Sequence, residues 1–367
     1  MKSMKPRIEP VRSTRPAVPK GNRARRVQPT IKDVARAARV SSATVSYVLN
    51  NTRSADRITG ETKRRILASA SRLGYRFNPL GRALQRGYTN QVTLIIVNWN
   101  LAISHAATAL AISRQAARHD LALTVQVMDN DEAAERFIQG HSLHNLGGVL
   151  VLWDSPAFEN SALRQLAADH VPVVDLLPGS PEGISMVTAD REDASFRATR
   201  HLLGLGHRHI GLIGDSITRP KTTLQKVAGY RRALEEAGLP YQPAFVQEVT
   251  EFGFEGGQLG YRKLAERCPQ ITALFCINDA IALGAMDAAH ELGRMCPDDL
   301  SIVGFGDSPE GSHWRPTLTT VALSADLVAE NAVALIKQQR QRRSTTARSV
   351  LIPEGLIIRE STRRAKV

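Results

Sequence analysis

Apolar residues recur at helical spacing in two short stretches near the beginning of the chain. The first stretch follows Thr30, a favourable N-cap residue, and the second follows Ser41. Their apolar positions are Ile31, Val34, Ala35 and Ala38 in the first stretch, and Val45, Val48 and Leu49 in the second. Because only Arg39 and Val40 separate the two, the pattern predicts helices joined by a tight turn. This is typical of a helix-turn-helix, although an ordinary helical hairpin has the same pattern.

A third helix is predicted from Gly60 to Leu73, with Thr59 as its N-cap and Gly74 as its C-terminal stop. The residues expected to close a three-helix core are Ile66, Leu67, Ala70 and Leu73. The segment 78–87 contains Pro79 but is too short for a stable helix alone in water. We expect it to become helical only against a partner.

From Gln91 onward, short continuous apolar runs alternate with amphipathic stretches. Strands are expected at 92–98, 121–127, 147–153, 171–176, 209–214, 271–278 and 300–306. Helices are expected near 104–119, 131–144, 159–170, 191–205, 222–237, 255–267, 279–293 and 324–340. Continuous apolar strands separated by helices predict parallel sheets covered on both faces, here as two doubly wound lobes. A cleft between the lobes, beyond the carboxyl ends of the strands, is the expected small-molecule site.

Charge is distributed unevenly along the 367 residues, whose formal net charge is +13. Residues 1–90 contain 21 Lys and Arg against 4 Asp and Glu, a balance of +17, which leaves −4 for residues 91–367. Clustered basic side chains bind DNA phosphates because they release condensed counterions, so the asymmetry favours DNA binding over a plain helical hairpin. Residues 1–29 hold nine basic residues, one acid and five prolines, which predicts a disordered basic arm.

Several classes of protein are disfavoured by what the sequence lacks. No apolar stretch approaches the length needed to span a bilayer, and the basic N-terminus lacks the apolar region of a secretory signal. The three cysteines show no framework spacing, which fits a reducing cytoplasm. The histidine pairs at 207/209 and 141/144 lack companion ligands, and no phosphate-binding loop or nucleophile motif occurs. We therefore expect a cytoplasmic protein that is not an enzyme and holds no cofactor or metal.

The segments "VSSATVSYVLN" and "ETKRRILASASRLGYRFNPLGRALQRG" resemble the LacI/GalR family of bacterial transcription regulators. In the core, "LLGLGHRHIGLI", "FCINDAIALGAMDAA", "DDLSIVGFGD" and "RPTLTTV" are similar to family segments at comparable spacing. The resemblance covers about residues 30–360. It implies an all-α helix-turn-helix head joined by a hinge to an α/β core of two lobes, like that of periplasmic binding proteins.

The function that the resemblance implies is a sequence-specific repressor. It would bind a palindromic double-stranded DNA operator as a homodimer or a tetramer, under the control of a sugar or nucleoside-like effector between the lobes. An alternative keeps the fold but leaves the cleft empty, which would make the protein a constitutive DNA-binding regulator. A further alternative, an α/β enzyme with a basic head, is disfavoured because no nucleophile–base pair or cofactor loop is present.

The resemblance also implies domain boundaries. The helix-turn-helix would span 30–77, the hinge helix and linker 78–90, the core 91–360 and a tail 361–367. The N-lobe would comprise 91–207 and 299–322, and the C-lobe 208–298 and 323–360. The chain would cross between lobes near Gly206 and His207, near 297–300, and just after "LTTV".

DNA-binding residues follow from the second helix and the hinge. The family's base-reading positions map onto Ser42, Ala43 and Tyr47, while Thr44 and Ser46 match positions used for phosphate contact or packing. Asn50 points away from the apolar stripe, as Ala43 and Tyr47 do. Leu84 matches the hinge leucine that wedges into the minor groove.

Two departures from the family pattern concern these elements. Arg39 stands where the family's turn usually has Gly, so a non-glycine residue is expected at positive φ, at a cost of about 1 kcal/mol. Gly81 replaces the usual hinge alanine, which should weaken the hinge helix.

Eight residues are candidates for the effector site. The resemblance assigns Asp190, Lys226 and Asp279 to it, although Lys226 stands where the family often has Arg and Asp279 would also suit a helix N-terminus. The loop after the first core strand adds Trp99, Ser104 and His105, of which Trp99 would equally suit a buried structural position. Phe254 and Phe305 are candidates for stacking on a ligand, with a core position as the alternative for Phe305.

Overall fold

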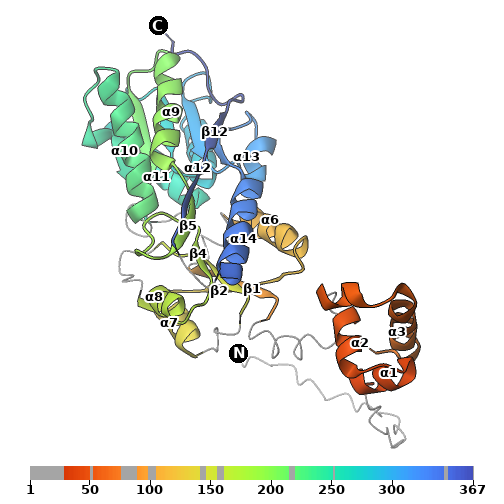
Figure 1. The fold of residues 1–367 in the computed structure, drawn as a ribbon. Helices are drawn as coiled ribbons and strands as arrows, with labels where there is room; N and C mark the ends of the chain where they lie inside the picture. Colours follow the sequence, from red (N-terminus) through yellow and green to blue (C-terminus); the bar gives the residue numbers. More distant parts are fainter. Residues whose placement is uncertain are drawn as a thin grey trace, which may run out of the picture. The chain divides into compact units, whose positions relative to one another are not determined.

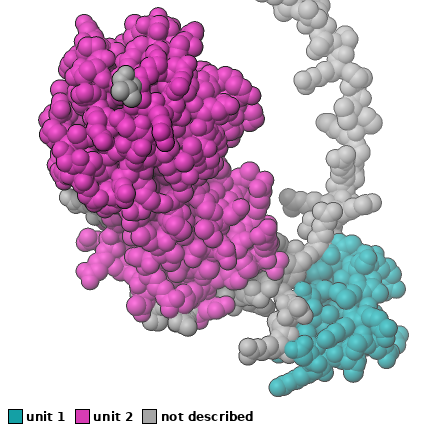
Figure 2. All heavy atoms as spheres, turned by 90° about the horizontal axis from the view of Figure 1, so that it is seen from above, with its two compact units in different colours: residues 1–79 teal, residues 80–367 magenta. Residues whose placement is uncertain are grey.

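The computed structural model describes residues 29–49, 53–75, 89–97, 105–140, 146–154, 161–214, 220–250, 253–342 and 346–366. The chain divides at Pro79 into two compact units, residues 1–79 and 80–367 (Figure 2). Three α-helices make up the described part of the first unit, and two α/β lobes make up the second. Among the described residues, no helix is both long and apolar enough to cross a membrane.

The helices of the first unit begin and end at the predicted caps. They are α1 (Ile31–Ala38), α2 (Ser42–Leu49), the 3-10 helix η1 (Arg53–Arg57) and α3 (Gly60–Leu73). Thr30 and Asp33 form a capping box at the start of α1, and the Ser41 hydroxyl accepts the Thr44 amide at 3.1 Å at the start of α2. Gly74 ends α3 in the left-handed conformation, at φ 64°.

A small apolar core holds these three helices together. Its buried members are Val34, Ala35, Ala38, Val45, Ile66 and Ala70. The expectation that Leu67 and Leu73 also close this core is wrong, because their side chains are 52% and 36% exposed. Leu67 lies about 100° around the helix from the stripe of Ile66 and Ala70. At the last turn of α3, Tyr75 packs against the core in place of Leu73.

The first lobe of the second unit is built on a six-stranded sheet, here called sheet A. Its strand order is β11 (Ser349–Ile352), β5 (Ser185–Ala189), β4 (Val173–Asp175), β3 (Gly148–Leu152), β1 (Gln91–Val97) and β2 (Ala122–Met128), all parallel. The helices of this lobe are α6 (Ala106–Ala117), α7 (Asp131–Gly140), α8 (Ser161–Ala168) and α14 (Ala325–Arg342).

Alternate residues of β1 explain why its sequence is apolar throughout. Leu94 and Ile96 pack in the same cluster as the buried residues of α6 and α14, whereas Ile95 and Val97 pack with those of α7 and α8. A parallel strand with helices on both faces has no solvent side, so the predicted arrangement is confirmed here.

The second lobe is built on another six-stranded sheet, sheet B. Its strand order is β12 (Glu354–Ile357), β10 (Thr319–Leu323), β9 (Ser301–Phe305), β8 (Ala273–Cys276), β6 (Ile210–Gly214) and β7 (Val246–Glu248), with β12 antiparallel. Its helices are α9 (Arg191–Gly204), α10 (Pro220–Glu236), the 3-10 helix η3 (Pro243–Phe245), α11 (Phe254–Arg267), α12 (Asp279–Glu291) and α13 (Pro309–His313). The pairs α9–α10 and α11–α12 each pack side by side (Figure 1).

The chain crosses between the lobes at three single residues. Asp190 separates β5 of sheet A from α9, which packs on sheet B. Ser324 separates β10 of sheet B from α14, which packs on sheet A, and Pro353 separates β11 from β12.

Two of the three expected crossings are therefore wrong. The residues near Gly206 and 297–300 join elements of the same lobe, because the strands that follow both pair within sheet B. The segment 299–322, expected in the first lobe, belongs to the second, since β9 pairs with β8. Within 323–360, α14 and β11 belong to the first lobe instead. The crossing expected after "LTTV" lies close to Ser324.

The segment expected to be a tail, 361–367, is packed into the second lobe over its described part, which ends at Lys366. Ser361 is fully buried; its carbonyl accepts the Ile302 amide at 2.8 Å and its hydroxyl accepts the Thr319 amide at 2.8 Å. The Ala365 amide donates to the Leu205 carbonyl at 2.9 Å. These residues complete the edge of the lobe.

Candidate functional site

Helix α2 presents two side chains to solvent while its opposite face is buried. Val45 is fully buried, whereas Ala43 is exposed and Tyr47 is 42% exposed, one helical turn further along. Ser42, Thr44 and Ser46 are half-buried. The hydroxyls of Thr44 and Ser41 lie 2.8 Å apart, so Thr44 takes part in the cap of α2. Asn50 and Leu84 lie outside the described residues.

The turn between α1 and α2 has the geometry that its helices need, with arginine in place of glycine. Arg39 has φ 53° and ψ 48°, the left-handed conformation, and its amide donates to the carbonyls of Ala35 and Arg36. The Nε atom of Arg65 on α3 donates to the Ala38 carbonyl at 2.9 Å, which ties α3 to the end of α1. The turn is therefore not rearranged by Arg39; the residue adopts the strained conformation instead.

Three of the predicted effector residues gather at the carboxyl ends of β8 and β9. The Lys226 ammonium on α10 donates to the Ile277 carbonyl at 2.8 Å and lies 3.9 Å from the centre of the Phe305 ring. Asp279 opens α12 directly after β8. Its carboxylate lies so close to Gly304 that a Cβ added there would be 2.3 Å from Oδ1.

The Asp279 carboxylate is bound within its own lobe. Its Oδ2 accepts the Ser308 amide at 2.5 Å, and its Oδ1 accepts the Thr320 hydroxyl at 2.5 Å. Burial raises the pKa of Asp279, and these hydrogen bonds oppose the rise. Asp279 therefore fixes the loop after β9 to the end of β8, which positions Phe305.

The other predicted effector residues lie apart from these contacts. Phe254, at the start of α11, packs against Trp314 with ring centres 6.0 Å apart. Asp190 is the N-cap of α9 and accepts the Asp193 amide at 2.9 Å, so it stands at one of the lobe crossings. His105 occupies the N-cap position of α6, and Trp99 and Ser104 lie outside the described residues.

A cluster of buried charges that the sequence did not predict lies where the lobes meet. Arg191, the first residue of α9, is 5% exposed and donates to the Thr188 hydroxyl at 3.0 Å. The carboxylates that act on its charge are those of Glu354, Asp154 and Asp175, each at most 6% exposed. Asp154 and Asp175 stand at the ends of apolar strands, a signal visible in "VLVLWD" and "VPVVD", whereas Glu354 carries no such signal.

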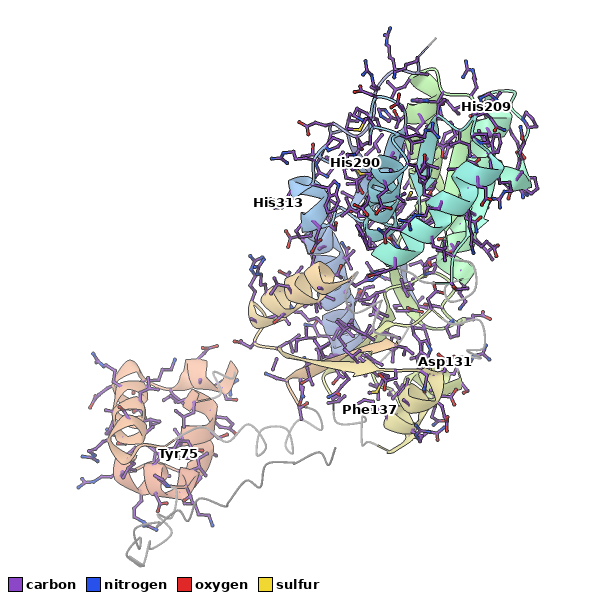
Figure 3. All side chains as sticks on the ribbon, turned by 180° about the vertical axis from the view of Figure 1, so that it is seen from behind. Tyr75, Asp131, Phe137, His209, His290 and His313 are labelled. Atoms are coloured by element: carbon purple, nitrogen blue, oxygen red, sulfur yellow. The ribbon has the colours of Figure 1, made fainter. Side chains whose placement is uncertain are left out.

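One hydrogen bond of this cluster joins the two lobes directly. The Thr222 hydroxyl on α10 donates to Asp154 Oδ2 at 2.7 Å, and Asp154 follows β3 of sheet A. The neighbouring Trp153 indole donates to Asp131 on α7 at 2.8 Å, which anchors the end of β3 (Figure 3). The polar contact between lobes is thus held from both sides by packed elements.

Burial shifts the titration of the acids in this cluster. It raises the pKa of Asp175 to about 6, against the opposing hydrogen bonds from the Leu177 amide and the Ser180 hydroxyl. It also raises the pKa of Glu354, against the opposing charges of Arg191 and Lys226. The lobes therefore meet over carboxyl groups that take up protons more readily than exposed ones.

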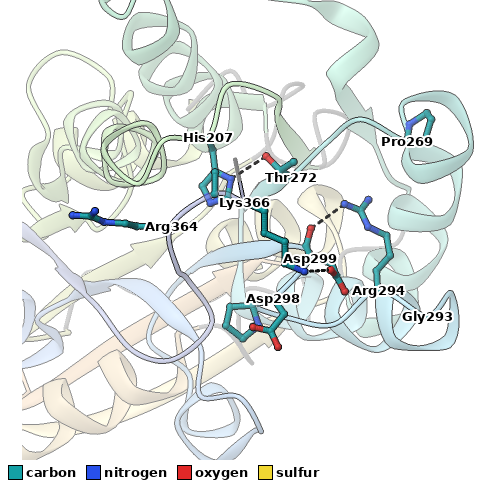
Figure 4. A pocket seen from close by; sticks show the side chains of 11 residues that line it. His207, Pro269, Thr272, Gly293, Arg294, Asp298, Asp299, Arg364 and Lys366 are labelled. Carbon is teal, nitrogen blue, oxygen red and sulfur yellow. Dashed lines mark hydrogen bonds and ion pairs between the residues drawn. The ribbon is translucent and has the colours of Figure 1, made fainter.

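A second hollow, of about 430 Å³, lies at the other end of sheet B, beside the amino ends of β8 and β9 (Figure 4). The Lys366 ammonium there pairs with Asp299 at 2.6 Å. His207 Nδ1 lies 2.9 Å from the Thr272 hydroxyl, and its Nε2 lies 3.1 Å from the Arg363 carbonyl. A carbonyl only accepts, so Nε2 carries the proton of a neutral imidazole. These paired groups indicate a packing role for this end of the lobe.

The histidine pair at 207/209 makes no metal site. His209 is exposed and packs edge-on against Phe245, with ring centres 6.0 Å apart (Figure 3). Across the described part of the chain, no group of three or more His, Cys, Asp or Glu is placed to hold a metal ion. Residues 141 and 144 lie outside the described residues.

Two family models match the chain. The model of bacterial regulatory proteins of the lacI family matches residues 30–78, and that of a periplasmic binding protein-like domain matches residues 199–362. Catabolite control protein A of Priestia megaterium is 31% identical over 340 residues, covering 91% of this chain and 99% of that protein. The HTH-type transcriptional repressor CytR of Escherichia coli (strain K12) is 30% identical over 337 residues, covering 91% and 96%.

Solved structures agree with the fold. The lac repressor dimer bound to operator and the anti-inducer ONPF has a TM-score of 0.78 at 23% identity, covering 92% of this chain and 99% of that one. The complex of the transcriptional regulator CelR with cellobiose has a TM-score of 0.68 at 25% identity, covering 91% and 100%. The expected arrangement of a helical head and a two-lobed α/β core is confirmed.

Proposed function

This chain belongs to the LacI family of bacterial regulatory proteins, and from that premise we propose that it is a repressor whose affinity for a palindromic operator is controlled by a small molecule bound between its two lobes. Its relatives are transcription regulators, so the family is one of DNA-binding proteins and not of enzymes. The observation that carries the proposal is the pairing of an outward-facing α2 with a core whose lobes meet over buried polar side chains.

The DNA-reading part of the proposal rests on Ala43 and Tyr47. Both side chains are exposed on α2 while Val45 holds the helix to its own unit. A methyl group at Ala43 fits the methyl group of a thymine, and the Tyr47 hydroxyl can bond to base edges or phosphates. Ser42, with its half-buried hydroxyl, would serve the first turn of the helix in the same groove.

The effector part of the proposal rests on Lys226, Phe305 and the carboxylates at the lobe contact. An aromatic ring with an ammonium beside it can take the face and the polar edge of a sugar or a nucleoside-like compound. Closure of the lobes on such a ligand would be transmitted to the DNA-binding unit. The coupling is reciprocal, so operator DNA would change effector affinity by the same factor.

A homodimer is the proposed assembly, because a two-fold protein matches a palindromic operator. One surface suits self-association: edge strand β2 leaves Val125 and Val127 43% and 37% exposed, and Leu110 on the adjacent α6 is 52% exposed. An exposed apolar edge of this kind normally requires cover.

Selection of bound DNA from a random pool tests the reading helix. Tyr47→Ala should change the selected sequence in each half-site, by about 1–3 kcal/mol per affected base pair. Tyr47→Phe separates the hydroxyl from the ring, and Leu67→Ala is a matched control at an exposed position of α3. An unchanged selected sequence in Tyr47→Ala would contradict the assignment. Repeating the selection with sugars and nucleosides tests the effector, and a site that responds to none of them would favour a constitutive regulator.

The hinge part of the proposal rests on sequence alone. Leu84→Ala keeps helix propensity but removes the side chain that would wedge into the minor groove. We expect a large loss of operator affinity and of DNA bending, with little change in non-specific binding. Equal bending by the variant and the parent would exclude the wedge.

A further inference from the structure

Three buried acceptor oxygens at the lobe contact have no hydrogen-bond partner among the described residues. They are Asp154 Oδ1, Gln225 Oε1 and Glu354 Oε2. Asp154 and Glu354 are only 6% and 3% exposed, so water does not replace the missing partners across most of their surface. A buried carboxylate oxygen without a donor is costly, and such an atom calls for an explanation.

The three oxygens come from both lobes and converge on one helix. Asp154 follows β3 of the first lobe and is bonded to Thr222 on α10. Gln225 lies one turn further along α10, and the next residue, Lys226, acts on the charge of Glu354 at the start of β12. The unpartnered oxygens therefore lie around the inner side of the first turns of α10.

The charges around these oxygens are mostly negative. Asp154, Asp175 and Glu354 are buried carboxylates, and Arg191 is the one fully buried guanidinium or ammonium in the part of the chain that the structure describes. Arg191 spends one Nη1 hydrogen on Thr188, and the half-buried Lys226 spends its ammonium on the Ile277 carbonyl and the Phe305 ring. Lys221 acts on Asp175 from a half-buried position.

This arrangement excludes two classes of occupant. A metal ion is disfavoured because no trio of His, Cys, Asp or Glu among the described residues has suitable placement. An anionic ligand, such as a sugar acid or a sugar phosphate, would face three buried carboxylates at close range. What the oxygens lack is donors, and what the cluster lacks is positive charge.

We infer that the effector is a small polyhydroxylated molecule bearing a primary amine, with its ammonium and hydroxyl groups donating to Asp154, Gln225 and Glu354. This rests on the proposed function, since it names the ligand class of the same cleft. The ammonium supplies the missing cation, and the hydroxyls supply the remaining donors. Because Asp154 belongs to one lobe and Gln225 and Glu354 to the other, such a ligand joins the lobes.

The test uses the full chain and matched sugars. Glucosamine, galactosamine and mannosamine are each compared with the parent sugar, the N-acetylated sugar and the uronic acid, by calorimetry and thermal shift. We expect at least one amino sugar to bind at least tenfold more tightly than its three counterparts. Glu354→Gln and Asp154→Asn, which preserve shape, should each remove most of that preference. Glu310→Gln, an exposed carboxylate of the second lobe, is the control and should bind as the parent does.

Several outcomes would overturn the inference. These are a neutral or acidic sugar that binds as well as its amino form, no binding by any amine in the panel, or unchanged amine binding in both variants. Operator binding of the same preparations is measured in parallel. If a neutral sugar released the operator, the proposed function would stand and the amine inference would fall. If no operator were selected at all, the proposed function itself would fail.

Discussion

At the scale of single residues, Arg39 carries a backbone strain that glycine would not. Its φ of 53° lies in the left-handed region, where a side chain costs about 1–2 kcal/mol. We expect Arg39→Gly to raise the free energy of opening of the first unit by about 0.5–1 kcal/mol, after the entropy gained by the unfolded glycine is subtracted. Amide hydrogen exchange of α1–α3 in the full chain should then slow several-fold.

The control for this prediction is the glycine that ends α3. Gly74 has φ 64° and no atom near its missing Cβ, so Gly74→Ala adds strain without a clash. Its amides should exchange faster than those of the parent. Faster exchange in Arg39→Gly as well would show that the arginine side chain contributes more than its strain costs.

His207 is a second residue whose chemistry has a measurable consequence. Burial lowers the pKa of His207, so the folded protein binds this proton less readily than the unfolded chain. Its contribution to stability is therefore complete above the ordinary histidine pKa of about 6.5 and falls as the pH drops below that value. His201, whose pKa burial also lowers, acts in the same direction.

Replacement of His207 by glutamine tests this dependence. Thr272 and Arg363 would lose well-placed partners, so we expect the free energy of unfolding at pH 7.5 to fall by about 1–3 kcal/mol. The decline of stability between pH 7 and pH 5 should be shallower in His207→Gln than in the parent. His209→Gln, at an exposed site, should leave the decline unchanged. Equal slopes in all three proteins would exclude His207 as the titrating group.

At the scale of elements, α11 and α12 cross so closely that only glycine fits. A Cβ added at Gly284 would lie 1.9 Å from the Phe254 carbonyl oxygen, and one added at Gly257 would lie 2.2 Å from that of Ile281. Alanine favours a helix by about 1 kcal/mol over glycine, but the clash should outweigh this. We expect Gly284→Ala to lower the free energy of unfolding by about 1–3 kcal/mol, measured by urea denaturation.

Gly204, in the last turn of α9, provides the comparison. Nothing lies within 4 Å of its missing Cβ, so Gly204→Ala should be neutral or stabilising. A Gly284 variant as stable as the Gly204 variant would mean that the two helices can move apart at little cost.

The elements also show which parts of the fold the sequence could predict. Strands such as β1 and β3 are continuous apolar runs because both of their faces are buried, and the helix caps at Thr30, Ser41 and Thr59 are local signals. Strands β5, β7, β10, β11 and β12 were not predicted. They are short, and β11 for example alternates exposed and half-buried residues without an apolar run. Their pairing depends on strands far away in the sequence, which no local pattern records.

The candidate site divides in the same way. Lys226, Asp279 and Phe305 follow strands or precede a helix glycine, so pattern and resemblance together find them. The Asp279 carboxylate, however, bonds to Ser308 and Thr320, which lie 29 and 41 residues later. Arg191 and Glu354 meet only because the chain crosses between lobes beside each of them, and a sequence read in one direction gives no sign of that meeting.

At the scale of the whole molecule, the bond from Thr222 to Asp154 couples one lobe to the other. Thr222→Val keeps the shape of the side chain but removes the donor, leaving both Asp154 oxygens without partners. A buried hydrogen bond to a charged group contributes about 1.5–3 kcal/mol, so we expect the lobes to separate more readily. Small-angle scattering should give a larger radius of gyration for Thr222→Val, while Thr222→Ser should match the parent. Identical scattering by all three proteins would exclude this bond as a determinant of lobe closure.

The three single-residue crossings have a consequence for how the protein is made. Sheet A needs β11 and sheet B needs β12, and both strands are synthesised after all the other strands of their sheets. The helix-turn-helix can fold on the ribosome while the rest of the chain is still being translated. Each lobe, by contrast, must wait with its apolar strands uncovered until the codons for residues 349–357 have been read. A premature stop codon or a proteolytic cut shortly before Ser349 would therefore leave both lobes incomplete at once, and the shortened chain should be a substrate for chaperones and proteases.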